Sequence, residues 1–324
     1  MYPSYSVAIR PLGKAGTIYE DLIHSLCSQS VPPEKIVVYI AEGYVIPKQV
    51  ENEIYVSCKK GMMSQRALPY HEIDSEWILF CDDDILLEKN AVKTLFDAVL
   101  DNNAECIAPN VFPNHQMPFK EKMLAAVFQG TWPSRYSKYA FRIRRSAHYS
   151  YRVKPPEVMV TQSFAGPCFL MKKKVFLEMD YSSECWIDQF PYALGDDQLI
   201  AYKLFVNGYT SLIHYNAGII HRDAQTAHSD SKRERYFNVR VLQYIIWHRT
   251  FFETRLSGVG RLVSVLCFYA QFICNLMVSA IPSLIRGDKS KTDASIRALR
   301  CGRQYVQSAD YQRIPKFRLN RTGK

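Results

Sequence analysis

Trp77-Ile78-Leu79-Phe80-Cys81-Asp82-Asp83-Asp84 is the stretch of this 324-residue sequence that decides its fold. Five apolar residues predict a buried β-strand, and the three aspartates that follow predict where it stops. Neighbouring carboxylates repel one another at the end of a buried strand, and a divalent cation such as Mg²⁺ or Mn²⁺ would relieve that repulsion. The alternative is a solvated acidic turn that caps the next helix.

The segments around this strand alternate between strand and helix patterns. Apolar runs predict strands, and a 3.6-residue period predicts helices. The strands are expected at 7–9, 36–40 and 54–56, and helices from Thr17 (with Glu20 at capping-box spacing), at 62–68 and after a cap at Asn90. This order predicts an α/β fold with a mostly parallel sheet covered by helices on both faces. Ligands of such sheets bind beyond the carboxyl ends of the strands, where the three aspartates stand.

A second acidic pair occurs in Gly195-Asp196-Asp197, just before a helical pattern that Asn207-Gly208 ends. Two carboxylates in a first helical turn could serve only the helix dipole and the free N–H groups, or one could act as a general base. Further along, Ile219-Ile220-His221 is typical of a short strand that ends in a polar ligand. A lone histidine, however, more often has a structural hydrogen-bonding role.

The charge of the chain is concentrated near its C-terminus. The whole sequence has 41 basic and 31 acidic residues, a net charge of +10. Residues 222–324 hold 19 of the basic and 7 of the acidic residues, so residues 1–221 are left with 22 and 24. An excess of +10 alone would suit nucleic acid, an acidic membrane surface or a phosphorylated small molecule. The uneven distribution predicts two regions, a domain over 1–225 and a basic, apolar helical tail over 226–324.

The cysteines and the N-terminus bear on the compartment. Nine cysteines, an odd number without CxxC spacing, indicate neither a disulfide framework nor a zinc ribbon. The first residues lack a basic region followed by an apolar one, so we expect no signal peptide. The prediction is a protein of the cytosol or of the cytoplasmic face of the membrane.

The tail contains Leu262–Ile285, 24 uncharged residues of which 18 are apolar. That length could span a bilayer. Its polar residues Ser264, Gln271, Asn275 and Ser279 fall on one helical stripe, which favours interfacial or re-entrant association, or packing in a soluble core or oligomer, over a lone span. Pro282 is expected to bend or end the helix. The basic stretch 119–157 is either an active-site excursion or a solvated surface insertion.

Taken in order, these segments resemble the family 2 glycosyltransferases over about residues 5–225. The resemblance rests on the Arg10 strand end, the helix from Thr17, Lys60-Gly61 with Gln65-Arg66, Asp82-Asp83-Asp84, Ser163-Phe164-Ala165-Gly166 and Gly195-Asp196-Asp197. It implies an inverting enzyme with the GT-A fold, in which a nucleotide-sugar half (about 1–110) precedes an acceptor half (about 111–225).

The resemblance also implies roles for individual residues. The donor nucleotide would be bound by Arg10, Glu42, Lys60, Arg66, Asp82, Asp83 and Gly166. The metal, Mn²⁺ or Mg²⁺, would be held by Asp82, Asp84 and His221. Asp197 would be the catalytic base, with Asp196 where the family usually has Glu. The second strand ends in Ala41-Glu42 instead of the usual two aspartates, so the base of the nucleotide is less defined than its diphosphate.

The tail resembles the membrane-associated tails of bacterial enzymes that glycosylate lipid-linked intermediates. We therefore expect transfer from a nucleoside-diphosphate sugar, a UDP-sugar first, to a polyprenyl-diphosphate-linked saccharide in surface polysaccharide assembly, at an anionic membrane surface. No nucleic acid partner is expected, and homo-oligomers through the C-terminal helices stay open. The alternatives are a palm-type two-metal nucleotidyltransferase and a non-catalytic scaffold with the same fold.

Overall fold

The computed structural model describes residues 2–11, 15–111, 119–191, 195–222, 232–253 and 258–317. The chain forms two compact units, each assembled from three segments. The first unit comprises 1–115, 155–188 and 208–228, and the second comprises 116–154, 189–207 and 229–324. The sequence predicts a domain over 1–225 and a tail over 226–324. That division into independently folding parts stays a prediction, because the two units describe only how the folded chain is packed.

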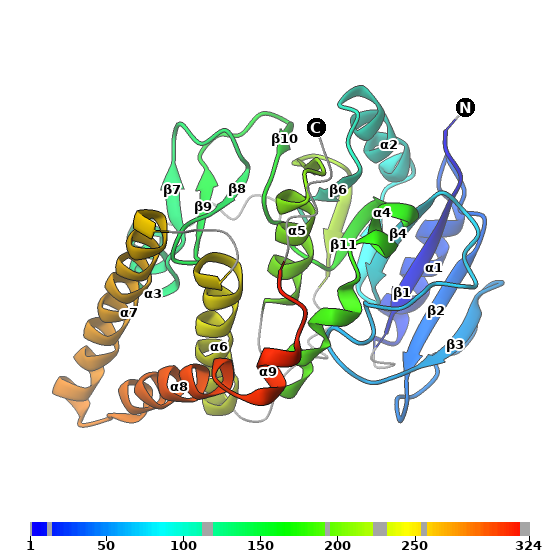
Figure 1. Cartoon of the computed structure of the whole chain (residues 1–324). Coiled ribbons are helices and arrows are strands. Elements are labelled where there is room, and N and C mark those ends of the chain that lie inside the picture. The colour runs from blue at the N-terminus through cyan, green and yellow to red at the C-terminus, as the bar shows by residue number, and fades with distance from the viewer. Residues whose placement is uncertain are drawn as a thin grey trace. The chain divides into compact units, whose positions relative to one another are not determined.

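The first unit is built on an eight-stranded sheet in the order β10-β12-β6-β11-β4-β1-β2-β3. Its strands are β1 (Tyr5–Arg10), β2 (Ile36–Ala41), β3 (Ile54–Cys58), β4 (Trp77–Asp82), β6 (Cys106–Pro109), β10 (Val158–Val160), β11 (Cys168–Lys172) and β12 (Ser211–His214). The strands β1, β2 and β3 lie side by side in the blue part of Figure 1.

Most neighbours in this sheet run parallel. Strand β1 pairs in parallel with β2 and β4, β2 with β3, and β6 with β12. Strand β11 runs antiparallel between β4 and β6, and β10 pairs antiparallel with β12 at the edge. The predicted mostly parallel α/β sheet is therefore confirmed.

Side chains alternate across this sheet, and each face has its own cover. Val7 and Leu79 belong to the core beneath α1 (Thr17–Cys27) and α2 (Ala91–Asp101). On the opposite face, Phe80 stacks on Phe169 and on Phe176 of α4 (Lys173–Glu178), with ring centroids 4.5 and 4.8 Å apart. Both faces are thus covered, as the sequence predicted.

Two local predictions need correction. Helix α1 begins at Thr17, but its N-cap is Gly16 and no side chain caps it, so the capping box is not formed. Residues 62–68, expected to be helical, form hydrogen-bonded turns. The cap at Asn90 is confirmed in position, since its carbonyl accepts the N–H of Thr94 at 2.9 Å.

A small two-stranded sheet completes the first unit. Strand β5 (Ile85–Leu87) begins just after the three aspartates and pairs antiparallel with β13 (Ile219–His221). The predicted strand at 219–221 is therefore confirmed. The 3₁₀ helix η1 (Tyr181–Gln189) spans the end of this unit's second segment.

The second unit is mainly helical. It contains α3 (Phe119–Gln129), α5 (Asp196–Val206), α6 (Lys232–Trp247), the π-helical turn η2 (His248–Glu253), α7 (Gly258–Arg286), α8 (Ser290–Val306), α9 (Ala309–Arg313) and a three-stranded sheet of β7 (Trp132–Ser134), β8 (Phe141–Ile143) and β9 (Tyr149–Arg152). The basic stretch 119–157 thus forms a helix and the whole of this small sheet, which its weak periodicity did not predict. Within the predicted helical tail, α6 continues into the π-helical turn η2, and residues 254–257 lie outside the described part of the chain.

Helix α7 turns its polar side toward the protein. Ser264, Asn275 and Ser279 are 0%, 3% and 4% exposed, whereas Leu266 and Met277 are 61% and 65% exposed. The predicted polar stripe exists, but it is the packed face of the helix. The helix continues through Pro282 to Arg286, so it does not end at this proline, and the expected bend there stays a prediction. By length and composition, Gly258–Ile281 is the one helix among the described residues that could cross a membrane.

Candidate functional site

The carboxyl ends of β1 and β4 bring three predicted donor-site residues together. Arg10 and Asp82 are register partners, and Arg10 Nη2 donates to Asp82 Oδ1 at 2.6 Å. The same nitrogen lies 3.4 Å from the carbonyl oxygen of Gly166. The Arg10 side chain is 6% exposed, so its ion pair with Asp82 is formed largely away from solvent. The guanidinium is therefore held in place by Asp82 at the edge where the resemblance predicts a diphosphate.

The third aspartate is paired with the predicted late histidine. Oδ1 of Asp84 lies 3.0 Å from Nε2 of His221, and their side chains are 9% and 16% exposed. Backbone pairing produces this contact, since His221 is the register partner of Ile85 and the Arg222 N–H donates to the Asp84 carbonyl at 2.8 Å. The pairing of β5 with β13 therefore holds the side chains of Asp84 and His221 in contact.

Asp84 and His221 fit a divalent cation in the nature of their donor atoms. A carboxylate and an imidazole are ligands that Mn²⁺ accepts, and nucleotide phosphates and water commonly complete such a shell. No group of three such side chains is gathered within the described residues. Asp82, the other predicted ligand, accepts the hydrogen bond from Arg10. The structure therefore brings two of the three predicted ligands into contact.

A cavity of about 210 Å³ opens beside the second aspartate. Asp83, which is 4% exposed, lines it together with the start of α1 and the loop after β2. The remaining lining residues are Ala15, Gly16, Tyr19, Glu20, Val45, Ile46, Pro47 and Lys48. Val45 and Ile46 are 68% and 62% exposed, so this wall is apolar and open to solvent. The sequence predicted Asp83 here but none of the other lining residues.

The loop after β3 carries two more predicted residues and is held by one that the sequence did not reveal. The Asp188 carboxylate accepts from the Met63 N–H at 2.7 Å, the Ser64 N–H at 3.0 Å and the Ser64 hydroxyl at 2.6 Å. A Cβ at Gly61 would lie 2.2 Å from Asp188 Oδ2, so only glycine fits there. These hydrogen bonds to Asp188, which we call the Asp188 clasp, explain why residues 62–68 form turns instead of the predicted helix.

The residues on and beside this loop differ in exposure. Arg66 is buried, and its carbonyl accepts the Tyr70 hydroxyl at 2.7 Å. Burial raises the pKa of Tyr70, although the charges of Arg10 and Arg66 act in the opposite direction. Lys60 is exposed, with Nζ 4.9 Å from the ring centre of Tyr44. Glu42 is exposed directly after β2. Lys60 and Glu42 therefore follow the carboxyl ends of β3 and β2 and are open to solvent, whereas Arg66 is buried.

The second acidic pair lies in the second unit. Asp196 and Asp197 form the first turn of α5, as predicted, and Asp196 is 5% exposed while Asp197 is half-buried. Gly195 precedes them with φ of 139°, and a Cβ there would lie 2.5 Å from Ile246 Cδ1. Palm-type polymerases need this motif in a hairpin between strands, whereas here it begins a helix. The helical setting counts against that alternative.

Comparison with known proteins identifies the architecture. A scan of protein-family models gave no match, and neither did a search of curated proteins. Among solved structures, the chain is similar to S. aureus TarS in complex with UDP-GlcNAc, with 14% identity, a TM-score of 0.53 and coverage of 94% of this chain and 81% of that one. It is also similar to GalNAc-T7 with UDP, GalNAc and Mn²⁺, with 13% identity, a TM-score of 0.53 and coverage of 97% and 58%. The chain therefore has the GT-A-like fold that the sequence predicted.

Proposed function

We propose that the protein is a glycosyltransferase that uses a nucleoside-diphosphate sugar, with a UDP-sugar as the first candidate. The observation that carries this proposal is the convergence of Arg10, Asp82 and Gly166 with the Asp84–His221 pair at one edge of the sheet. The same fold holds UDP-GlcNAc in TarS and UDP in GalNAc-T7. Both likenesses support a uridine nucleotide as the donor.

The donor would extend along the carboxyl ends of β1 to β4. Asp83 and the apolar wall of Val45 and Ile46 suit the uncharged part of a nucleotide, whose base and ribose need shape and hydrogen bonds more than charge. Arg10, Lys60 and Arg66 supply positive charge for the diphosphate. Glu42 would accept a hydrogen bond from the base, and Gly166, which has no side chain, would line the cleft between donor and acceptor.

A divalent cation, Mn²⁺ or Mg²⁺, would be held by Asp84 and His221, with Asp82 at its side. When bound, such an ion neutralises negative charge on the leaving diphosphate. Arg10 would help to neutralise the same negative charge, and it also holds the Asp82 carboxylate in place. Mn²⁺ accompanies UDP in the GalNAc-T7 structure, which supports a metal in this fold.

The proposed chemistry is a single displacement with inversion. Asp197 would accept the proton of an acceptor hydroxyl as that oxygen attacks the anomeric carbon, while the bond to the diphosphate breaks. Asp196, buried in the same helical turn, would hold the start of α5 in place. No covalent intermediate on the protein is needed, because one in-line step inverts the configuration.

The finer assignments follow from the sequence resemblance. They comprise membership of glycosyltransferase family 2, a polyprenyl-diphosphate-linked saccharide acceptor, a role in surface polysaccharide assembly, and a peripheral or re-entrant position at the cytoplasmic face of the membrane. The exposed apolar side of α7 and the basic tail support the membrane position.

Titration calorimetry with UDP and Mn²⁺, together with a hydrolysis screen of nucleotide sugars, tests this function. The wild-type chain is expected to bind UDP in a metal-dependent way and to hydrolyse at least one UDP-sugar slowly. Asp84→Ala should abolish the metal dependence. Asp74→Ala, which changes an exposed aspartate of the same unit, is the control and should leave it intact. Absence of nucleotide binding by the wild type with either metal would contradict the proposal.

A further inference from the structure

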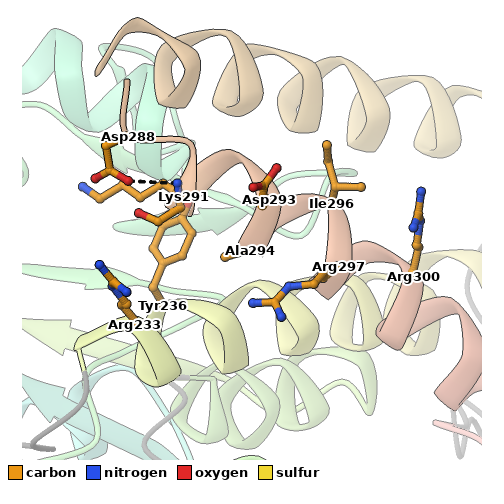
Figure 2. A pocket seen from close by; sticks show the side chains of 10 residues that line it. Arg233, Tyr236, Asp288, Lys291, Asp293, Ala294, Ile296, Arg297 and Arg300 are labelled. Atoms are coloured by element: carbon orange, nitrogen blue, oxygen red, sulfur yellow. Dashed lines mark hydrogen bonds between the residues drawn. The ribbon is translucent and has the colours of Figure 1, made fainter. Parts of the chain in front are cut away.

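The second unit has a cavity of about 790 Å³ that the proposed reaction does not use. It lies between α6 and α8, near the turn that joins α7 to α8, and Figure 2 shows residues of both helices around it. Arg233 rises from α6, and Arg297 reaches from α8 into the space between the helices (Figure 2). Lys291 and Arg300 also line it. The cavity is therefore a basic recess in a region otherwise built of packed helices.

The cations of this recess exceed its carboxylates by four to two. Asp288, one of the two, accepts the Ser290 N–H at 3.0 Å. Hydrogen bonds from the side chain and the N–H of Ser290, followed by the charges of Arg233 and Lys291, lower its pKa. Arg297 packs over the ring of Phe237, with 5.8 Å from its guanidinium carbon to the ring centre. Among the described residues, none of the four cations is in an ion pair with a carboxylate within 4.0 Å. All four cations are exposed, so an anion with several oxygens could reach their donors.

The floor of the recess is polar and anchored. The Tyr236 hydroxyl lies 2.9 Å from Ser295 Oγ of α8 and 3.5 Å from Ser279 Oγ of α7. This one side chain of α6 thus joins the three helices. Burial acts to raise the pKa of Tyr236, but the charge of Arg240 and the hydrogen bonds with Ser279 and Ser295 outweigh it and lower this pKa. These contacts hold the recess in shape without using the four cations.

The helix that leads into this recess exposes an apolar stripe. Its residues recur at helical spacing on α7, and each is about half exposed or more: Leu262, Leu266, Ile273, Met277, Ile281 and Ile285. The opposite, polar side of α7 is already used. Ser264 accepts the indole N–H of Trp247 at 2.9 Å and donates to the Arg145 carbonyl, and Gln271 donates to the Val127 carbonyl. The apolar stripe is therefore fixed outward by hydrogen bonds on the other side.

We propose that the recess binds the phosphate of an anionic membrane lipid while the apolar stripe of α7 enters the acyl layer. The apolar stripe lies on α7, and the cations of the recess lie mostly on the next helix, α8. A phospholipid suits this arrangement because it has acyl chains for the stripe and a phosphate for the cations. A second copy of the chain would cover the stripe but would leave the four cations without a partner. The inference rests on the membrane association proposed above and adds the site that selects the headgroup.

Vesicle flotation of the full chain tests the site. The vesicles contain phosphatidylcholine alone or mixed with phosphatidylglycerol, and wild type is expected to prefer the mixture. Arg297→Gln with Arg300→Gln should lower binding to the mixture by about tenfold. The matched control, Arg303→Gln with Arg313→Gln, removes two exposed cations of α8 and α9 that do not line the recess, and it should lower binding by less than twofold. Equal losses in both variants would mean general charge attraction and would overturn the recess as a site.

The other occupants are outcomes of the same experiment. Leu266→Gln with Met277→Gln should weaken binding to both kinds of vesicle, with unchanged circular dichroism. If it instead converts a dimer into a monomer and wild type binds no vesicle, a second copy covers the stripe. If inorganic phosphate raises the melting temperature of wild type but not of the Arg297/Arg300 variant, and no lipid preference exists, the recess takes a soluble anion. Metal-dependent UDP binding, measured without lipid, tests the proposed glycosyltransferase function separately from the lipid site.

Discussion

Oδ1 of Asp84 lies 3.0 Å from Nε2 of His221, where β5 and β13 form their short antiparallel sheet. Asp84 comes from the first segment of the first unit and His221 from its third, and the three register pairs between β5 and β13 bring them together. A buried carboxylate beside an imidazole can serve as half of a metal shell or as an ion pair. The two roles differ in what happens when one partner is removed.

His221→Ala is expected to lower Mn²⁺ affinity in the presence of UDP by about 10-fold to 100-fold, because one of two protein donors in contact is lost. Electron paramagnetic resonance of free Mn²⁺ measures it. His24→Ala changes an exposed histidine of the same unit and should have no effect. A pair with a purely structural role would give lower thermal stability but unchanged Mn²⁺ affinity.

Asp197→Asn is expected to lower transfer turnover by about 10²-fold to 10⁴-fold, since an amide cannot accept the proton of the acceptor hydroxyl. UDP binding should be unchanged, because the proposed donor residues lie elsewhere. Asp310→Asn, a matched change in the first turn of the exposed helix α9, serves as the control. Turnover close to that of wild type would remove Asp197 from the role of base.

Asp188→Ala is expected to destabilise the first unit by roughly 3 kcal/mol, because two buried N–H groups and a hydroxyl lose a charged acceptor. The loop with Lys60 and Arg66 would also lose its shape, so the Kd for UDP should rise. Asp188→Asn keeps an acceptor oxygen and should show a smaller loss. Chemical denaturation and calorimetry measure the two effects, and unaltered values in Asp188→Ala would contradict the clasp.

His148 gives the second unit a pH dependence. Burial, with smaller effects of Arg240 and Arg144, lowers its pKa from 6.5 to about 4, and its Nδ1 lies 2.8 Å from the Ser146 carbonyl. The folded chain holds this ring neutral, whereas the unfolded chain protonates it below about pH 6.5. The stabilisation is therefore full above pH 6.5 and is lost as the pH falls toward 4, by roughly 3 kcal/mol in total.

Thermal melts of wild type and His148→Gln between pH 7 and pH 4.5 check this dependence. The difference in stability between the two proteins should shrink as the pH falls, because glutamine does not titrate. His24→Gln changes an exposed histidine and should keep the slope of the wild type. Parallel curves for wild type and His148→Gln would show that His148 does not titrate in this range.

Local sequence was sufficient for the elements whose patterns agree with their burial. The apolar run 77–81 with its aspartates predicted β4 and its end, and Gly195-Asp196-Asp197 predicted the start of α5. Arg10 was expected at a strand end from the resemblance, and the parallel pairing of β1 with β4 brings that end beside Asp82. These features depend on the period of the sequence and on the direction of neighbouring strands.

Other features depend on partners far along the chain. The turns at 62–68 follow from Asp188, and nothing near these residues announces it. The amphipathic pattern of α7 gives the width of each face but not which face packs. The polar face packs inward because Trp247 needs an acceptor and the carbonyl groups of Arg145 and Val127 need donors, and residues of this face supply them. The strands of 119–157 are three or four residues long, too short for a pattern to reveal them.

The three-segment composition of the second unit sets an order of events during synthesis. Residues 116–154 and 189–207 leave the ribosome well before 229–324, which supply the donors for the carbonyl groups of Val127 and Arg145 and the rings that pack on Tyr202. Until the last segment emerges, these early segments have no complete core of their own. A chain stalled soon after residue 228 would therefore hold a largely finished first unit and two segments of an incomplete second unit, a state that exposes apolar surface to aggregation and to chaperones.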